Sequence, residues 1–188
     1  MEDKINISRY KELRKANPNS LTDEIFFELI SYNAEIESHI SYNQKEKYFS
    51  LIKNYLSGVI APDEFRWEFF KMEDQDCEEA DILSQDFEAL EHIILTDNLE
   101  RFCDLKVKIS IFCSDYGTIV DDGNGGPMTE SQFYALINAC YFQLQKIFPI
   151  LSSTNLPYET LIQRSFNMLA SIVVSEIMLV LAYLFIEN

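Results

Sequence analysis

Hydrophobic side chains along most of this chain recur at intervals of three and four residues, the spacing that places them on one side of a helix. Residues 47–56 follow this spacing, and Gly58 comes just after the last apolar position. Because glycine adopts the left-handed conformation without a Cβ clash, Gly58 predicts the end of that helix. Pro62 suits the first turn of a second helix, whose buried side is predicted to include Phe65 and Phe69.

A third helix is predicted over residues 81–94, where the apolar positions narrow to a single stripe. These positions recur at i, i+4, i+7 and i+11, which places them on one side of a helix. The acidic run before it, residues 73–81, is interpreted as a connector between the second and third helices. The stripe consists of Leu83, Phe87, Leu90 and Ile94, and the opposite side of Asp81, Gln85, Glu88 and His92.

Helical spacing extends to both sides of this region. Thr22 is the predicted N-cap of a helix that runs to about residue 40, and a short basic helix is predicted before it. The sequence TESQ at residues 129–132 is a capping box, which predicts a further helix after it. Residues 104–112 alternate apolar and polar side chains as a strand does, but their apolar positions also fit a helix, so both alternatives stand.

The C-terminal part of the sequence holds its most apolar stretch. Residues 157–186 are predicted to form an apolar helix, and residues 168–186 come close to the length that spans a bilayer. Glu176 lies near the middle of that stretch, where a carboxylate in lipid is costly. We therefore expect this helix to be buried against protein, and insertion into a membrane is the alternative.

Composition places the chain among folded proteins of a reducing compartment. Hydrophobic residues make up 47% and aromatic residues 13%, which excludes intrinsic disorder. The four cysteines show no CxxC pair, and the first residues are polar and charged, unlike a secretory signal. We expect free thiols, no metal site and a cytoplasmic location.

The net charge of −16 is unevenly distributed along the chain. Residues 62–104 hold 15 acidic and 3 basic residues, a net charge of −12. Because no basic patch is available to neutralise phosphates, direct binding of nucleic acid is not expected. A concentrated negative charge favours a basic partner instead.

The sequence contains none of the familiar catalytic patterns. It has no nucleophile elbow, phosphate-binding loop, dinucleotide fingerprint or HExxH motif, so we expect neither enzymatic activity nor a cofactor. Asp121, Asp122 and Asn124 invite comparison with a calcium-binding loop. The glycines among them occupy positions where an EF-hand needs oxygen ligands, and we interpret this stretch as a plain loop.

One run of the sequence resembles a known family. The run YFSLIKNYLSGVIAPDEFRWEFFKM, an acidic gap and then DILSQDFEALEHII is similar to the colicin D immunity and self-protective colicin-like immunity proteins. Their pattern continues with a short amphipathic helix, here TESQFYALINACYFQLQ. The resemblance implies a four-helix bundle, which corresponds here to a core over residues 44–147. With the helices predicted on both sides of it, we expect an all-α helical bundle in a single helical domain of residues 1–188. Residues 104–127 are additional to that pattern.

The resemblance also implies a function, and the acidic surface found above supplies the residues expected to make the contact. Proteins of this family bind the nuclease domain of a cognate toxin, which cleaves tRNA, and block its active site. The alternative is a helical structural or adaptor protein that forms a homodimer through its apolar C-terminal helix. The residues expected to contact a basic toxin are Trp67, Asp74, Asp76, Glu78, Glu79, Asp81 and Glu88.

Overall fold

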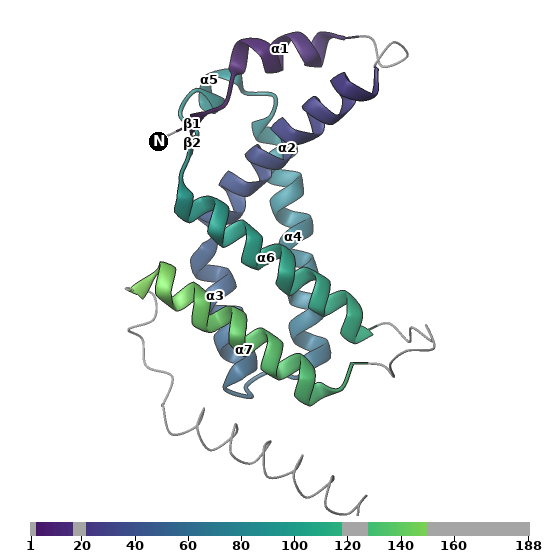
Figure 1. Ribbon diagram of the computed structural model, residues 1–188, viewed down its shortest axis with the longest axis vertical. Coiled ribbons are helices and arrows are strands. Elements are labelled where there is room, and N and C mark those ends of the chain that lie inside the picture. Colours follow the sequence, from purple (N-terminus) through teal and green to yellow (C-terminus); the bar gives the residue numbers. More distant parts are fainter. Residues whose placement is uncertain (1–2, 17–21, 118–127, 150–188) are drawn as a thin grey trace, which may run out of the picture.

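The computed structural model describes residues 3–16, 22–117 and 128–149 (Figure 1). Within these ranges the chain forms seven helices and one antiparallel pair of two-residue strands. The prediction of an all-α fold is confirmed. The elements are β1 (Asp3–Lys4), α1 (Ile7–Lys15), α2 (Asp23–Asn43), α3 (Lys45–Leu56), α4 (Pro62–Leu83), α5 (Phe87–Leu90), β2 (Ile94–Leu95), α6 (Asp97–Gly117) and α7 (Glu130–Ile147).

Local sequence signals set several helix ends. The Thr22 side chain accepts a hydrogen bond from the amide of Ile25 and caps α2. Thr129 and Gln132 form the expected capping box at the start of α7. Gly58 follows α3 with a φ of 76°, a conformation that glycine adopts without steric cost. These three predictions are confirmed because each depends only on residues close in sequence.

The predicted helix over residues 81–94 is wrong. Helix α4 continues through the acidic run 73–81 and ends at Leu83, and α5 is a single turn. Asp86 explains the break, because its carboxylate accepts hydrogen bonds from the amides of Glu88 and Ala89 and starts a new turn.

The segment interpreted as an addition supplies a core helix. Residues 104–117 belong to α6, so the strand alternative for residues 104–112 is wrong and the helix alternative is right. Leu105 and Ile109 are buried one turn apart, while Val107 between them is 55% exposed. The burial therefore follows the helical period and not the alternation of a strand.

Two hydrophobic clusters share α4. The larger joins α3, α6 and α7 to the N-terminal half of α4, where Phe65 and Phe69 are fully buried. The smaller joins the N-terminal segment, α2 and α5 to the C-terminal half of α4 through Ala80. Figure 1 shows α1 and α5 at one end of the molecule and α3 and α7 toward the other. Helix α4 thus connects the two ends, and the residues on its inward side belong to both hydrophobic clusters.

Some sequence-based predictions fall outside the described residues. These are the apolar helix over residues 157–186 and the loop containing Asp121, Asp122 and Asn124. Across the helices that the structure does describe, none combines the length and the apolarity needed to cross a membrane. All four cysteines are free thiols, as expected.

Candidate functional site on helix α4

The outward side of α4 carries a row of exposed side chains. Counted from Trp67, these side chains stand at positions i, i+7, i+11 and i+14, and at this spacing they project from the same side of a helix. All are exposed, and Trp67 exposes 76% of its surface. Tryptophan is enriched among the residues that dominate binding energy, so this position favours contact with another molecule. We call this set the acidic stripe: Trp67, Asp74, Glu78 and Asp81.

The three carboxylates of the acidic stripe differ from other acidic residues of α4 in their ion pairing. Among the residues that the structure describes, none of the three is in an ion pair. Elsewhere on α4, Asp63 pairs with Arg66, and Glu68 pairs with Lys71. Like charges spaced at i,i+3 and i,i+4 repel, at a cost of about 0.2–0.5 kcal/mol for each pair. The carboxylates of the acidic stripe therefore repel one another, and a cationic partner would offset this unfavourable interaction.

Two further acidic residues expected at the contact lie off this stripe. Glu79 is exposed, but its Oε2 accepts a hydrogen bond from Nε2 of Gln44 at 2.8 Å. Glu88 is exposed on α5, beyond the turn that ends α4. The structure thus groups the acidic stripe on one side of a single helix and leaves these two residues outside it.

Asp76 is a correction to the expected contact residues. It follows Trp67 by nine residues, about two and a half helical turns, so the two side chains leave α4 on opposite sides. Its side chain is fully buried. A buried carboxylate is not available to a partner protein, and Asp76 instead belongs to the interior of the molecule.

Three side chains surround the Asp76 carboxylate. Its Oδ2 accepts hydrogen bonds from Ser41 Oγ at 2.5 Å and from the Tyr48 hydroxyl at 2.6 Å. The Lys106 ammonium lies 3.5 Å from the same oxygen and donates to Ser41 Oγ at 2.7 Å. Lys106 also donates to Glu37 Oε1 at 3.0 Å. We call this set, drawn from α2, α3, α4 and α6, the buried network: Glu37, Ser41, Tyr48, Asp76 and Lys106.

Burial and neighbouring charges set the protonation of two members of the buried network, Lys106 and Tyr48. Burial acts to lower the pKa of Lys106, but the neighbouring carboxylates, Glu37 first among them, outweigh it and the pKa is raised. Burial raises the pKa of Tyr48, and its hydrogen bond to Asp76 adds to the rise. The lysine is therefore held as a cation and the tyrosine as a neutral donor, which suits a structural role.

The sequence does contain a signal for the burial of Asp76. This residue follows Met72 by four positions and Phe69 by seven, so it continues the apolar side of α4. The interpretation of residues 73–81 as a connector ended the helix too early and concealed that continuation. No comparable pattern in the sequence predicts that Ser41 and Lys106, which are distant in sequence, lie beside Asp76.

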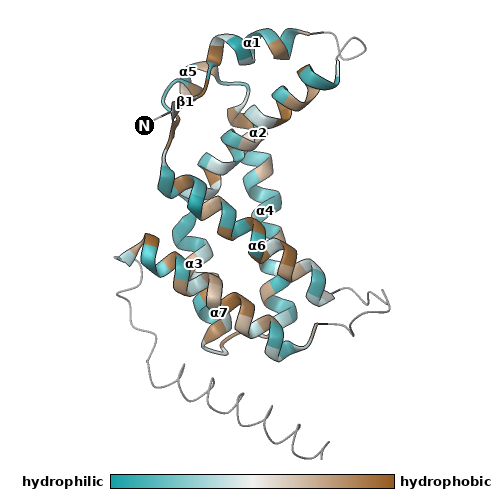
Figure 2. Cartoon of the chain, in the orientation of Figure 1, coloured by the Kyte–Doolittle hydropathy of each residue, from teal (hydrophilic) through white to brown (hydrophobic). Residues whose placement is uncertain are grey.

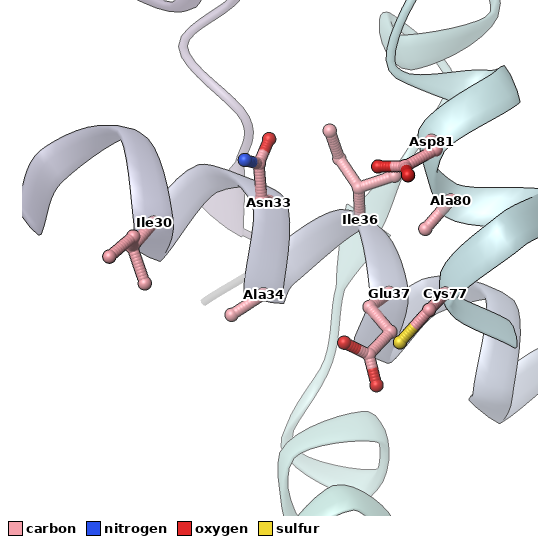
Figure 3. A pocket seen from close by; sticks show the side chains of 8 residues that line it. All are labelled: Ile30, Asn33, Ala34, Ile36, Glu37, Cys77, Ala80 and Asp81. Carbon is pink, nitrogen blue, oxygen red and sulfur yellow. The ribbon is translucent and has the colours of Figure 1, made fainter. Parts of the chain in front are cut away.

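A pocket of about 220 Å³ opens between α2 and α4 beside the acidic stripe (Figure 3). Figure 3 shows Glu37 of α2 and Cys77 of α4 approaching each other across it. Burial and the Glu37 carboxylate raise the pKa of the Cys77 thiol to about 11, so this thiol stays protonated and is a weak nucleophile. The lining residues are Ile30, Asn33, Ala34, Ile36, Glu37, Cys77, Ala80 and Asp81.

Comparisons with known proteins give no relative for this chain. No family model, no curated protein and no solved structure matches it. The resemblance to colicin-like immunity proteins remains a prediction from the quoted residues. The function is therefore inferred from the chemistry of α4 and its surroundings.

Proposed function

We propose that this chain is a non-enzymatic immunity protein that binds a basic nuclease toxin and covers its active site. The binding surface is the acidic stripe together with the pocket between α2 and α4. The observation that carries the proposal is a row of exposed carboxylates that make no ion pair within the described residues, on the same side of α4 as an exposed tryptophan. The class of toxin, a nuclease that cleaves tRNA, comes from the resemblance to colicin-like immunity proteins.

The charge of α4 supports a basic partner. Helix α4 holds nine acidic and two basic residues. A nuclease that cleaves tRNA must attract phosphates, so its active site presents cations. Carboxylates in a fixed row on a helix can occupy the places of successive phosphates. Electrostatic attraction between such surfaces speeds association and disfavours acidic or neutral partners.

Apolar side chains at the two ends of the stripe support a protein partner over a small ion. Trp67 is 76% exposed near the start of α4, and Ile82 is 72% exposed near its end. The two are 15 residues apart, which corresponds to about 22 Å along a helix axis. Large apolar anchors set among polar groups are typical of protein interfaces. The stripe therefore has the extent and the chemistry of a protein contact.

The pocket beside the stripe fits a lysine or arginine side chain of the partner. Ile30, Ala34 and Ala80 offer apolar contacts to the aliphatic stem of such a side chain. Asp81 lines the same pocket and has no ion pair within the described residues, whereas Glu37 already binds Lys106. We therefore assign Asp81 as the acceptor for the cationic head group.

A growth assay with a matched charge control tests the proposal. Cells express a basic nuclease domain that cleaves tRNA, taken from a toxin encoded next to this chain where such a reading frame is found, together with the chain or a variant. The test variant is D74K/E78K/D81K, and the control carries the same charge change at three exposed acids away from α4. The control variant is E46K/E91K/D115K.

Loss of protection by the test variant, with protection kept by the control, is the expected result. W67A should also weaken protection, because removal of a buried interface anchor costs about 2 kcal/mol or more of binding energy. Equal protection by the test variant and the wild-type chain, at equal expression, would contradict the proposal. The acidic stripe would then be ordinary solvated surface.

A further inference from the structure

A second surface with the opposite chemistry lies between α6 and α7. A groove of about 570 Å³ runs along the N-terminal half of α6 and the C-terminal half of α7, which pack against each other. Leu105, Ala139 and Ile147 line it, and so does Phe142, which is 58% exposed. Figure 2 shows hydrophobic colour along α7, whereas much of α4 is hydrophilic. The ring of Phe142 and the side chain of Ala139 thus face open space in this groove, Ile147 is half-buried at its edge, and Leu105 is buried at its base.

The groove also gathers three cations in a chain that has twice as many acidic as basic residues. Arg101, Lys108 and Lys146 all line it, together with a single acidic residue, Asp104. Among the described residues, none of these three cations is in an ion pair. Lys146 lies over the ring of Phe142 at 4.4 Å. The natural occupant of such a groove is an apolar segment that carries a few carboxylates.

The sequence that follows α7 has this chemistry. Ile147 lines the groove, and the described part of the chain continues only to Pro149. Residues 168–186 are almost wholly apolar and contain Glu176 as their only charged residue. Residues 150–188 together hold three acidic residues and one basic residue. An apolar, mildly acidic segment is therefore joined to the chain beside an apolar, basic groove.

We propose that the groove between α6 and α7 is the docking site for residues 157–186 of the same chain. Phe142 and Ala139 contact the apolar side chains of the segment, and Lys108 and Lys146 meet its carboxylates. The short connection raises the effective concentration of the segment to the millimolar range. Docking of a second copy has no such advantage, and it must overcome the repulsion between two chains of net charge −16.

Zero-length cross-linking of the full chain tests this assignment. A carbodiimide joins a lysine to a carboxylate only when the two are in contact, and mass spectrometry identifies the linked peptides. The expected product joins Lys108 or Lys146 to Glu159 or Glu176, the two carboxylates of residues 157–186. A mixture of unlabelled and ¹⁵N-labelled chains shows whether each link lies within one chain. Links within one chain, formed at a rate independent of protein concentration, are expected.

Variants of the groove separate docking from chance proximity. F142N removes the exposed ring, and A139Q fills the groove without changing charge. Loss of a buried aromatic contact should lower the docking equilibrium constant by about tenfold or more. The matched control is F27N, at a phenylalanine 66% exposed on α2. Both groove variants should slow cross-linking severalfold, while F27N should not.

Three outcomes would overturn the assignment. Cross-links that join an unlabelled peptide to a ¹⁵N-labelled peptide would show that a second copy of the chain fills the groove. Absence of the links, with the chain bound to phosphatidylcholine vesicles in a flotation assay, would show that lipid takes the segment. Equal cross-linking in F142N, A139Q and F27N would show that the groove plays no part. The inference does not rest on the proposed binding of a toxin, because none of these measurements includes one.

Discussion

Asp74 and Asp76 lie two residues apart on α4 and have opposite surroundings. Asp74 is exposed on the acidic stripe, whereas Asp76 is fully buried and accepts hydrogen bonds from Ser41 and Tyr48. Two residues rotate a helix by about 200°, so near neighbours in an acidic run face opposite sides. A high count of carboxylates along a sequence therefore mixes residues that hold the fold with residues that meet solvent or a partner.

The inward and outward sides of α4 contribute differently to the free energy of unfolding. On the inward side, the Asp76 carboxylate and the Lys106 ammonium are buried together, and removal of one leaves the other with less compensating charge. On the outward side, the carboxylates repel one another and add nothing to the stability of the free chain. Substitutions on the two sides should consequently change stability in opposite directions.

The largest expected effect is that of D76N. The substitution keeps the shape of the side chain but removes the charge that faces Lys106. We expect a loss of about 3 kcal/mol in the free energy of unfolding, the low end for a broken buried pair because Glu37 still binds Lys106. Urea denaturation measures this loss, with D74N as the matched control.

D74N should change the free energy of unfolding by less than about 0.5 kcal/mol, as is usual for exposed positions. An equal loss in D74N and D76N would contradict the contrast between the two sides. Asp76 Oδ1 is buried and has no hydrogen-bond partner within the described residues. The amide group that D76N places there would lack an acceptor, which adds to the expected loss.

The second effect is the coupling between Asp76 and Lys106. K106M keeps much of the length of the side chain and removes its charge. If the two groups stabilise each other, the double variant D76N/K106M should lose less stability than the sum of the single losses. A coupling energy of about 0.5–3 kcal/mol is expected for residues in one network. A coupling of zero in the double-mutant cycle would show that Asp76 and Lys106 do not stabilise each other.

The third expected effect is a decrease in the free energy of unfolding at alkaline pH, which arises in the buried network. The pKa of Tyr48 is raised above 10.0 and that of Lys106 above 10.5 in the folded chain. The folded chain therefore holds more protons than the unfolded chain above these values, and the free energy of unfolding falls as pH rises. The stabilisation that the protonated side chains of Tyr48 and Lys106 provide is fully present below pH 10.0. It is lost as pH rises through their pKa values in the folded chain.

The urea midpoint, measured on both sides of pH 10.0, checks this expectation. Y48F removes the tyrosine contribution, so its midpoint should fall less steeply with pH than that of the wild-type chain. A midpoint that stays constant, or rises, above pH 10.5 would contradict the described surroundings of Lys106.

The smallest effect on stability is expected on the outward side. The neutral variant D74N/E78Q/D81N removes two like-charge pairs and should stabilise the free chain by about 0.4–1 kcal/mol in total. Higher salt should reduce this gain, because exposed charges are screened over about 10 Å at 0.1 M. Thermal unfolding at two salt concentrations measures it, and a clear loss of stability would show that these carboxylates have cationic partners in the folded chain.

The parts of the fold that were predictable depend on a few neighbouring residues. Thr22, Gly58 and Thr129 mark helix ends through hydrogen bonds and backbone conformations within one turn. The exposure of Trp67 also follows from its position off the side that carries Phe65 and Phe69. These features need no knowledge of the rest of the chain.

The parts that were missed depend on contacts distant in sequence. The apolar spacing of residues 83–94 is helical, but Ile94 pairs with Lys4 in a short antiparallel ladder. The polar partners of Asp76 come from α2, α3 and α6, up to 35 residues away. Hydrophobic spacing alone shows neither a strand partner nor a buried cation.

The central claim is that the outward side of α4 binds a basic nuclease domain while the inward side holds the fold. Its most direct test is the association rate constant of that domain with three proteins: the wild-type chain, D74N/E78Q/D81N and D76N, each folded at the working temperature. We predict that D74N/E78Q/D81N associates at least about tenfold more slowly at low salt, that high salt narrows the difference, and that D76N matches the wild-type chain. Equal rates for the wild-type chain and D74N/E78Q/D81N at low salt would contradict the claim.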